Sequence, residues 1–426
     1  MTTSLWRHGD FMKLWAAQSI SLIGTQITAL ALPLTAILLL HATPIEVGVL
    51  ATMQYLPFLL FCLPAGAIVD RLPRIPLLVV TDLCRAVLLI AVPVFGWLGG
   101  LSLAVLYPIA FLVGGLTVFF DVGHQSYLPS IVAGDQLVDG NTKLNLTYSV
   151  AQLAGPGLGG VLVQAFTAPV AILVDAVSYV SSAGLLRLIR HRDVRTADEP
   201  RGKIVDPREL VSQTREGLRY VFRHAQIRPL AFATGISNFF YLFGMTGAIF
   251  TLYAVRELSL TPAQLGVVLL VGNVGAIAGS LIGGRLLRRW RFGPVMVTTV
   301  SAGAAATALM AVATPANAMV VLAIGILVGE IGVMVYNIGQ ISLRQAVTPL
   351  DMQGRMNATV RFVNWGPIPV GAFLGGLAGQ ELGLHAVLWI ATVGNMLPAV
   401  PLLLSKVGRM RTMPAPLPEA TGATGD

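Results

Sequence analysis

The sequence has few charged residues and almost no cysteine. Only 11% of its 426 residues are Asp, Glu, Lys or Arg, whereas soluble globular proteins have about 25%. The two cysteines, Cys62 and Cys84, both lie in apolar stretches, so we expect neither a disulfide framework nor a cysteine metal site. This shortage of charge argues against a soluble enzyme and indicates that lipid surrounds most of the chain.

Two further signals are missing. The first residues, MTTSLWRHGDFMKLW, contain no short apolar core followed by a small-residue cleavage site, so we expect the first apolar segment to be retained. No G-x-x-x-x-G-K-[ST] loop occurs, so ATP is not expected to act within this chain. We expect no catalytic residues, no cofactor and no metal; His124 has no second ligand nearby in the sequence.

Long hydrophobic runs are what the sequence has in abundance. Apolar segments of about 20 residues recur from end to end, and each can cross roughly 30 Å of hydrocarbon. The sequence therefore predicts an all-α membrane protein. The twelve transmembrane helices are expected near 14–40, 45–69, 76–98, 101–124, 141–166, 169–190, 228–254, 263–286, 293–314, 318–345, 356–381 and 384–405.

The basic residues lie on one side of these predicted helices. Most of the 28 Lys and Arg residues fall at the N-terminus, in the even-numbered connections or near their helix ends, or at the C-terminus, and Arg256 falls on the opposite side. The positive-inside rule then places this side, with both termini, in the cytoplasm, and we expect a multi-pass protein of the cell inner membrane. The net charge of +8 indicates attraction to anionic lipid. Nucleic acid is a poor alternative partner because the cations are spread over separate loops.

The chain is internally duplicated. We predict an N-terminal six-helix half at 1–190, a cytoplasmic linker with an amphipathic helix at 191–227, a C-terminal six-helix half at 228–406 and a disordered cytoplasmic tail at 407–426. Superposing the halves sets AGPGLGG (154–160) on VGAFLGG (370–376) in register. Two pseudo-symmetric halves are typical of transporters, whose halves rock around a site between them.

One loop and several helix segments carry a family resemblance. GAIVDRLPR (66–74) resembles the G-x-x-x-D-R-x-x-R loop signature of the major facilitator superfamily. LWAAQSISLIG (14–24), LVDAVSYVSSA (173–183) and QGRMNA (353–358) are similar to its branch of macrolide, multidrug and siderophore exporters. The resemblance covers nearly the whole chain and implies the major facilitator fold, which agrees with the predicted duplication.

The loop signature implies a latch between the two halves at the cytoplasmic face. Gly66 would let the second and eleventh helices approach closely, while Asp70 and Arg74, assisted by Arg71, form charge-assisted hydrogen bonds. The alternative is that the arginines only set the topology and Asp70 caps a turn.

AGPGLGG lies in the fifth predicted helix and resembles the superfamily's G-P-x-x-G-G signature of drug antiporters. Pro156 removes one backbone donor and bends the helix, and Gly155, Gly159 and Gly160 leave a smooth face for a neighbouring helix. The same letters echo a G-x-G-x-x-G nucleotide loop, but that loop needs a preceding strand, and none is predicted.

Three intramembrane acids are candidates for proton coupling, because a buried carboxylate in lipid is costly. Glu330 lies about 12 residues into the tenth helix, roughly 18 Å deep, and the resemblance implies that it faces a central cavity. Asp121 lies near the cytoplasmic end of its helix, where we expect it to pair with a latch arginine. Asp175 lies on a peripheral helix and is expected to make a buried inter-helix hydrogen bond.

Two residues usual in proton antiporters of this branch are missing. Thr25 follows the glycine of the first helix, where an acid is common, and YPIAFLVGGLTVFF (107–120) contains no arginine. Proton antiport therefore depends mainly on the resemblance, and a Na⁺ exchanger or a facilitator stays open.

The resemblance also implies which residues line the cavity. Polar and aromatic walls suit an amphipathic organic molecule and not a sugar phosphate, for which we expect no arginine pair at mid-membrane depth. The lining is expected to include Gln18, Gln26, Phe120, Asn238, Tyr241, Phe243, Asn337 and Asn364.

The sequence therefore predicts a monomeric secondary transporter that exports drug-like or natural-product molecules in exchange for protons. A proton-coupled importer or facilitator of the same fold is the first alternative. The second is a membrane signalling or assembly protein that has kept the fold without transport.

Overall fold

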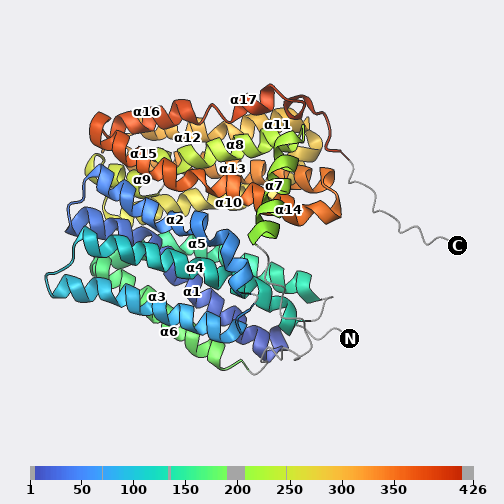
Figure 1. The fold of residues 1–426 in the computed structure, drawn as a ribbon. Helices are drawn as coiled ribbons and strands as arrows, with labels where there is room; N and C mark the ends of the chain where they lie inside the picture. The colour runs from blue at the N-terminus through green and yellow to red at the C-terminus, as the bar shows by residue number, and fades with distance from the viewer. Residues whose placement is uncertain (1–4, 70, 133–135, 190–206, 246, 415–426) are drawn as a thin grey trace.

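A computed structural model describes residues 5–69, 71–132, 136–189, 207–245 and 247–414. Within these ranges the regular secondary structure is helical, without a strand. The all-α membrane fold is confirmed. Figure 1 shows long helices packed side by side, most of them running along the same axis.

The first half of the chain forms one bundle, which Figure 1 shows from blue to green. After the short helix η1 (Leu5–Arg7), each of its six crossings is one long helix, although α1 ends in a π-helical turn, η2 (Thr35–Leu39). The crossings are α1 (Gly9–Leu34), α2 (Pro44–Val69), α3 (Arg74–Trp97), α4 (Leu103–Ile131), α5 (Leu137–Ala165) and α6 (Ala168–Arg187).

The second half forms another bundle, in which four crossings are interrupted. It follows α7 (Pro207–Arg223), the helix expected in the linker. The interrupted crossings are α8 (Ile227–Phe240) with the π-helix η4 (Tyr241–Met245) and α9 (Gly247–Arg256), α11 (Phe292–Val300) with α12 (Ala302–Ala311), α14 (Leu350–Trp365) with α15 (Pro367–Leu382), and α16 (Leu384–Gly394) with α17 (Ala399–Leu403); the unbroken ones are α10 (Pro262–Arg289) and α13 (Ala318–Val347).

The predicted count of twelve crossings agrees with this arrangement. Eleven segments of the described chain are long and apolar enough to span a membrane. The remaining crossing, α14 with α15, is divided at Gly366 and Pro367. Proline lacks the N–H group that a continuous helix needs, so each part alone is short.

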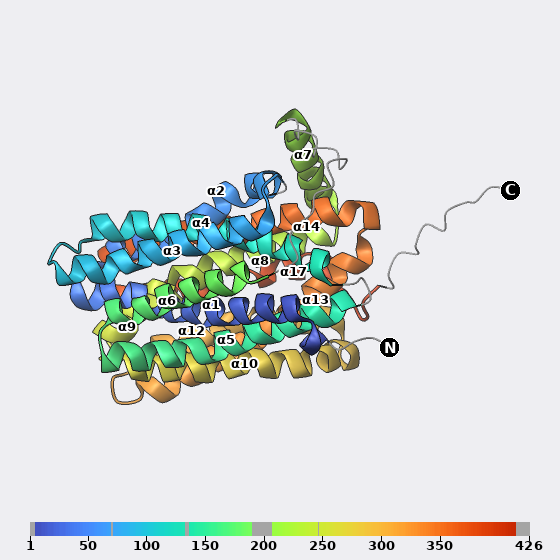
Figure 2. The same ribbon diagram turned by 90° about the horizontal axis from the view of Figure 1, so that it is seen from below.

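Both ends of the described chain lie at one end of the molecule, as Figures 1 and 2 show. We call this end, with α7 beside it, the terminal face, and the other end the opposite face. The two bundles lie next to each other along their length (Figure 1).

The two bundles meet backbone to backbone near the opposite face. On one side α2 crosses α15, where a Cβ added to Gly376 would lie 2.8 Å from the Cα of Gly48. On the other side α5 crosses α10, where a Cβ added to Gly266 would lie 3.1 Å from the Cα of Gly160. These four residues, which we call the glycine crossings, leave no room for a side chain between the helices.

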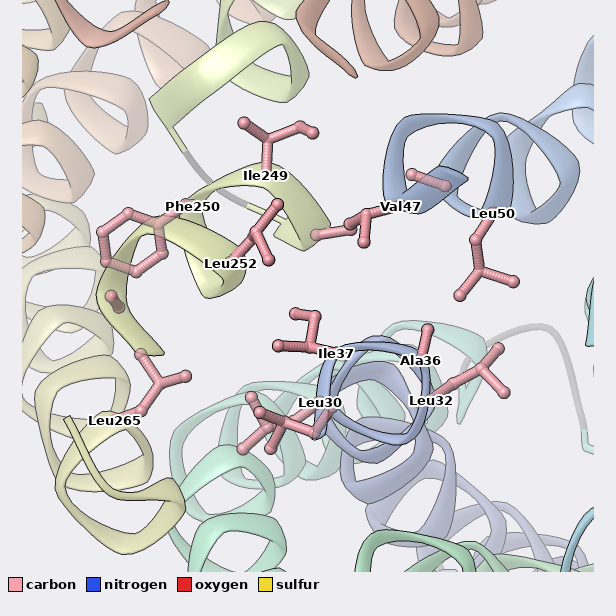
Figure 3. Close-up of a cluster of buried hydrophobic side chains, with 14 of the residues drawn as sticks. Leu30, Leu32, Ala36, Ile37, Val47, Leu50, Ile249, Phe250, Leu252 and Leu265 are labelled. Carbon is pink, nitrogen blue, oxygen red and sulfur yellow. The ribbon is translucent and has the colours of Figure 1, made fainter. Parts of the chain in front are cut away.

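An apolar cluster fills the space between the glycine crossings. Figure 3 shows Ile37 of the first crossing, Val47 of α2 and Leu252 of α9 close together, with Ile249 and Phe250 on other sides of α9. All five side chains are buried. The opposite face is therefore closed by residues of both halves.

The polar tail begins later than expected. Val407–Arg409 form the short helix η5, and the side chain of Val407 is fully buried. The backbone N–H groups of Phe292 and Gly293 donate to the carbonyls of Arg411 and Met410. The prediction of disorder from residue 407 is therefore wrong for these residues, because backbone pairing with α11 orders them.

We predict that Gly266→Ala opens the opposite face. The new methyl group would lie 2.7 Å from the Pro156 carbonyl oxygen, so α5 and α10 must separate. A single cysteine placed at Leu269, in a variant without Cys62 and Cys84, should then react several-fold faster with a membrane-impermeant maleimide added at this face.

The matched control is Gly284→Ala on the same helix, where an added Cβ meets no atom within 4 Å. Both changes raise helix propensity by up to about 1 kcal/mol, so propensity cannot explain a difference. Equal labelling of the two variants would contradict the role of the crossing.

Candidate functional site in a central cavity

A cavity of about 880 Å³ lies between the two bundles. This volume is within the range of about 300–1,000 Å³ that is typical of small-molecule sites. The cavity extends to the terminal face, where Gln125, Asn141 and Asn145 of its wall are exposed. Toward the opposite face its lining ends at apolar residues, among them Phe250 and Leu269.

The cavity wall is polar and aromatic rather than uniformly apolar. Its aromatic part includes Phe58 and Trp365, which stack across the two halves with ring centroids 5.5 Å apart. The uncharged polar part includes Gln18, Gln26, Tyr55, Tyr148, Gln152 and Asn273. Such a wall offers both hydrogen bonds and flat apolar surface.

Glu330 of α13 and Tyr241 of η4 form a hydrogen-bonded pair in this wall. The Tyr241 hydroxyl donates to Oε1 of Glu330 at 3.1 Å, and both residues line the cavity. The carboxylate therefore lies where the sequence places it, on a helix that borders the cavity. The tyrosine stands at the first residue of a π-helical turn, a feature frequent at functional sites.

Four of the eight expected lining residues are in the described wall: Gln18, Gln26, Phe120 and Tyr241. The other four pack within the second half. Asn238 donates to the Asn364 carbonyl at 2.8 Å, which joins α8 to α14. Phe243 is buried among neighbouring phenylalanines, and Asn337 accepts a hydrogen bond from Gln340 on its own helix. The described wall of the cavity therefore does not include these four residues.

Asp121 of α4 lies in the cavity wall. The sequence favours a pairing with Arg71 or Arg74, but the guanidinium groups whose charges act on it are those of Arg85 and Arg361. Both arginines also line the cavity. The expectation that the cavity offers no arginine pair is therefore wrong. Arg361 comes from α14, a helix whose inward face the sequence pattern does not define.

Arg85 of α3 is the centre of a buried polar cluster in the first half. Only 2% of its surface is exposed, and it forms an ion pair with Asp82, as their i, i+3 spacing predicts. Its guanidinium carbon lies 4.4 Å from the ring centroid of Phe120 and 4.2 Å from that of Tyr179. Aromatic faces stabilise a desolvated cation in this position.

Asp175 of α6 belongs to the same cluster but lies outside the central cavity. One carboxylate oxygen accepts a hydrogen bond from Ser178 of the same helix at 3.0 Å. The Thr28 side chain of α1 also interacts with this carboxyl group, and Gly24 of α1 packs directly on it, which agrees with the expected inter-helix contact. Asp175 borders a side pocket of about 210 Å³ that shares Thr25 with the central cavity.

The expected latch at the terminal face stays a prediction. Asp70 lies outside the described residues, and Arg71 is exposed. A Cβ added to Gly66 would meet no atom within 4 Å, so the expected close approach at this glycine is absent. The reason is that the halves meet at the opposite face and the cavity reaches the terminal one.

The AGPGLGG motif serves two helix contacts at once. Gly155 and Gly159 pack on α1, where an added Cβ would press on Gln26 and on the Ile27 backbone, whereas Gly160 packs on α10. Pro156 lines the central cavity between them. The motif therefore lies between the cavity and the closed face.

Two bundles around a polar cavity that reaches one face are typical of transporters. The profile of the Major Facilitator Superfamily matches residues 14–371. The chain belongs to this superfamily.

Relatives and solved structures agree with this assignment. The multidrug efflux pump Tap of Mycolicibacterium fortuitum is 26% identical over 371 residues, which is 85% of this chain and 87% of the pump. A bacterial homologue of the iron transporter ferroportin in its inward-facing state superposes with a TM-score of 0.71 at 20% identity, covering 95% of this chain and all of the other. The nucleoside transporter NupG gives 0.71 at 11% identity, covering 92% and 98%. These two structures show the fold.

We predict that Arg85→Met destabilises the protein by about 3–5 kcal/mol, because it leaves the buried Asp82 carboxylate without its counter-ion. The double variant Arg85→Met/Asp82→Leu removes both charges and should recover most of this loss. Thermal unfolding in detergent compares the two. A double variant as unstable as the single one would show that the ion pair is not the reason.

Proposed function

We propose that this protein is a secondary transporter that exports amphipathic organic molecules across the inner membrane in exchange for protons. The observation that carries the proposal is the 880 Å³ cavity between the halves, which is lined by Glu330 and by exposed residues of the terminal face such as Gln125 and Asn145. A cavity with this wall suits a molecule with flat apolar surface and a few hydrogen-bonding groups.

The charge of the two faces supports one orientation of the protein in the membrane. Lys and Arg residues concentrate in the connections at the terminal face, so this face is cytoplasmic by the positive-inside rule. The structure is then inward-facing, the state in which an exporter takes up its substrate. The multidrug efflux pump Tap, to which the chain is similar, supports export over import.

Glu330 is the proposed coupling group. It is the acid that enters the cavity wall from the second half, and its described hydrogen-bond donor is a neutral hydroxyl, that of Tyr241. A charged carboxylate with so little compensation is costly at this depth, so it exchanges a proton as the cavity opens to each side in turn. Asp121 and Asp175 remain secondary candidates, because Arg85 offers them a counter-charge.

We predict that Glu330→Gln abolishes transport driven by a pH gradient while the protein keeps its fold. Proteoliposomes and a panel of fluorescent amphipathic dyes measure the gradient-driven flux. Full gradient dependence in the variant would refute the assignment.

The matched control is Glu257→Gln, which changes an acid just beyond the end of α9, outside the cavity lining. It should retain the wild-type dependence on the gradient. A wild-type flux that follows the dye gradient alone would favour a facilitator, and dependence on Na⁺ would favour a Na⁺ exchanger.

We also predict that cells carrying the gene tolerate several amphipathic drugs better than cells without it, by severalfold in the inhibitory concentration. Intracellular accumulation measured with the same compounds separates export from import. Unchanged accumulation of every compound would favour a protein that has kept the fold without transport.

A further inference from the structure

A second groove lies at the terminal face, away from the central cavity. Its volume is about 340 Å³, and it separates the start of α8 from the residues around the end of α17. These elements belong to the first and last crossings of the second half. The groove shares no lining residue with the central cavity, so the proposed transport site does not explain it.

The charge of this groove has one sign. Arg228 and Lys406 line it and are both exposed, and no acid is among the described lining residues. Neither cation has an ion-pair partner in the described part of the chain. The groove therefore presents two uncompensated positive charges.

Two backbone N–H groups at the start of α8 already have a hydrogen-bond acceptor. The N–H groups of Gln226 and Ile227 both point to Nδ1 of His224, at 3.3 Å. Partial burial lowers the pKa of His224 below its usual value, which keeps this nitrogen neutral and able to accept at pH 7. The guanidinium and the ammonium groups are therefore the ones available to an anion.

Apolar side chains lie next to both cations. Phe232 follows Arg228 by one turn of α8 and is 45% exposed, and Leu404 precedes Lys406 and is 83% exposed. Because α8 runs away from the terminal face, Phe232 lies deeper than Arg228, and Leu404 adds exposed apolar surface next to the end of α17. This order, cations at the surface and apolar surface below, matches the order of groups in a phospholipid.

We infer that this groove binds an anionic phospholipid of the cytoplasmic leaflet, with its phosphate between Arg228 and Lys406 and an acyl chain along Phe232 and Leu404. Guanidinium and ammonium groups hold phosphate through charge-assisted hydrogen bonds. A zwitterionic lipid brings its own cation, for which the described wall offers no acid. Because Phe222 of α7 packs on Phe232 with centroids 5.6 Å apart, the bound lipid also borders the linker between the halves.

The test is lipid retention by the full-length protein, measured by native mass spectrometry. Phosphatidylglycerol and phosphatidylcholine with identical acyl chains are offered separately. We expect the wild type to retain phosphatidylglycerol at least tenfold more strongly. Arg228→Gln/Lys406→Gln should lose this preference, since each cation near the membrane surface contributes to binding of anionic lipid.

The matched control is Arg215→Gln/Arg219→Gln, which removes two exposed cations from α7 outside the groove. It should keep the preference, and all variants should unfold at the same temperature without added lipid, because the changed side chains are exposed. Equal retention of the two lipids, or an equal loss in both double variants, would overturn the inference. Displacement of the lipid by millimolar inorganic phosphate would also overturn it, since the groove would then be a site for free anions.

Discussion

The closed face of this transporter depends on the approach of helix backbones at four glycines. Lipid removes the hydrophobic drive that holds helices together in water, so helices in a membrane associate through close packing. At Gly48 with Gly376, and at Gly160 with Gly266, no side chain separates the helices. The apolar cluster of Figure 3 can fill the space between the halves only because these crossings bring them so near.

The internal duplication relates the two glycine crossings to each other, but it does not relate the buried charged residues of the two halves. Gly160 and Gly376 occupy equivalent places in AGPGLGG and VGAFLGG, and each meets a glycine near the start of a helix in the other half. The first half, however, surrounds Arg85 with three carboxylates, those of Asp82, Asp121 and Asp175, while the second half brings Glu330 to the cavity. The duplication therefore relates the backbone contacts between the halves, whereas each half has its own set of buried charges.

Much of this arrangement could be predicted from the sequence, because lipid imposes strong rules on it. Apolar run length defines the crossings, and the i, i+3 spacing of Asp82 and Arg85 defines their ion pair. The position of single side chains could not be predicted in the same way. Phe243 and Asn337 pack against neighbours within the second half, whereas Arg361 lines the cavity, because contacts between side chains, which apolar run length does not define, decide where each one points.

The polar contacts across the closed face are few and weak enough to be exchanged during transport. They include the Asn273 side chain donating to the Gln152 carbonyl at 2.6 Å and Arg256 donating to the Ala42 carbonyl at 2.7 Å. Each such hydrogen bond stabilises the closed state by about 0.5–3 kcal/mol. The glycine contacts add dispersion attraction, and no side chain has to be immobilised to form them. A ligand shifts the equilibrium between two states only by the difference between its affinities for them. The closed face is therefore held mainly by backbone packing at the glycines and by the apolar cluster between them, with polar contacts as a smaller addition.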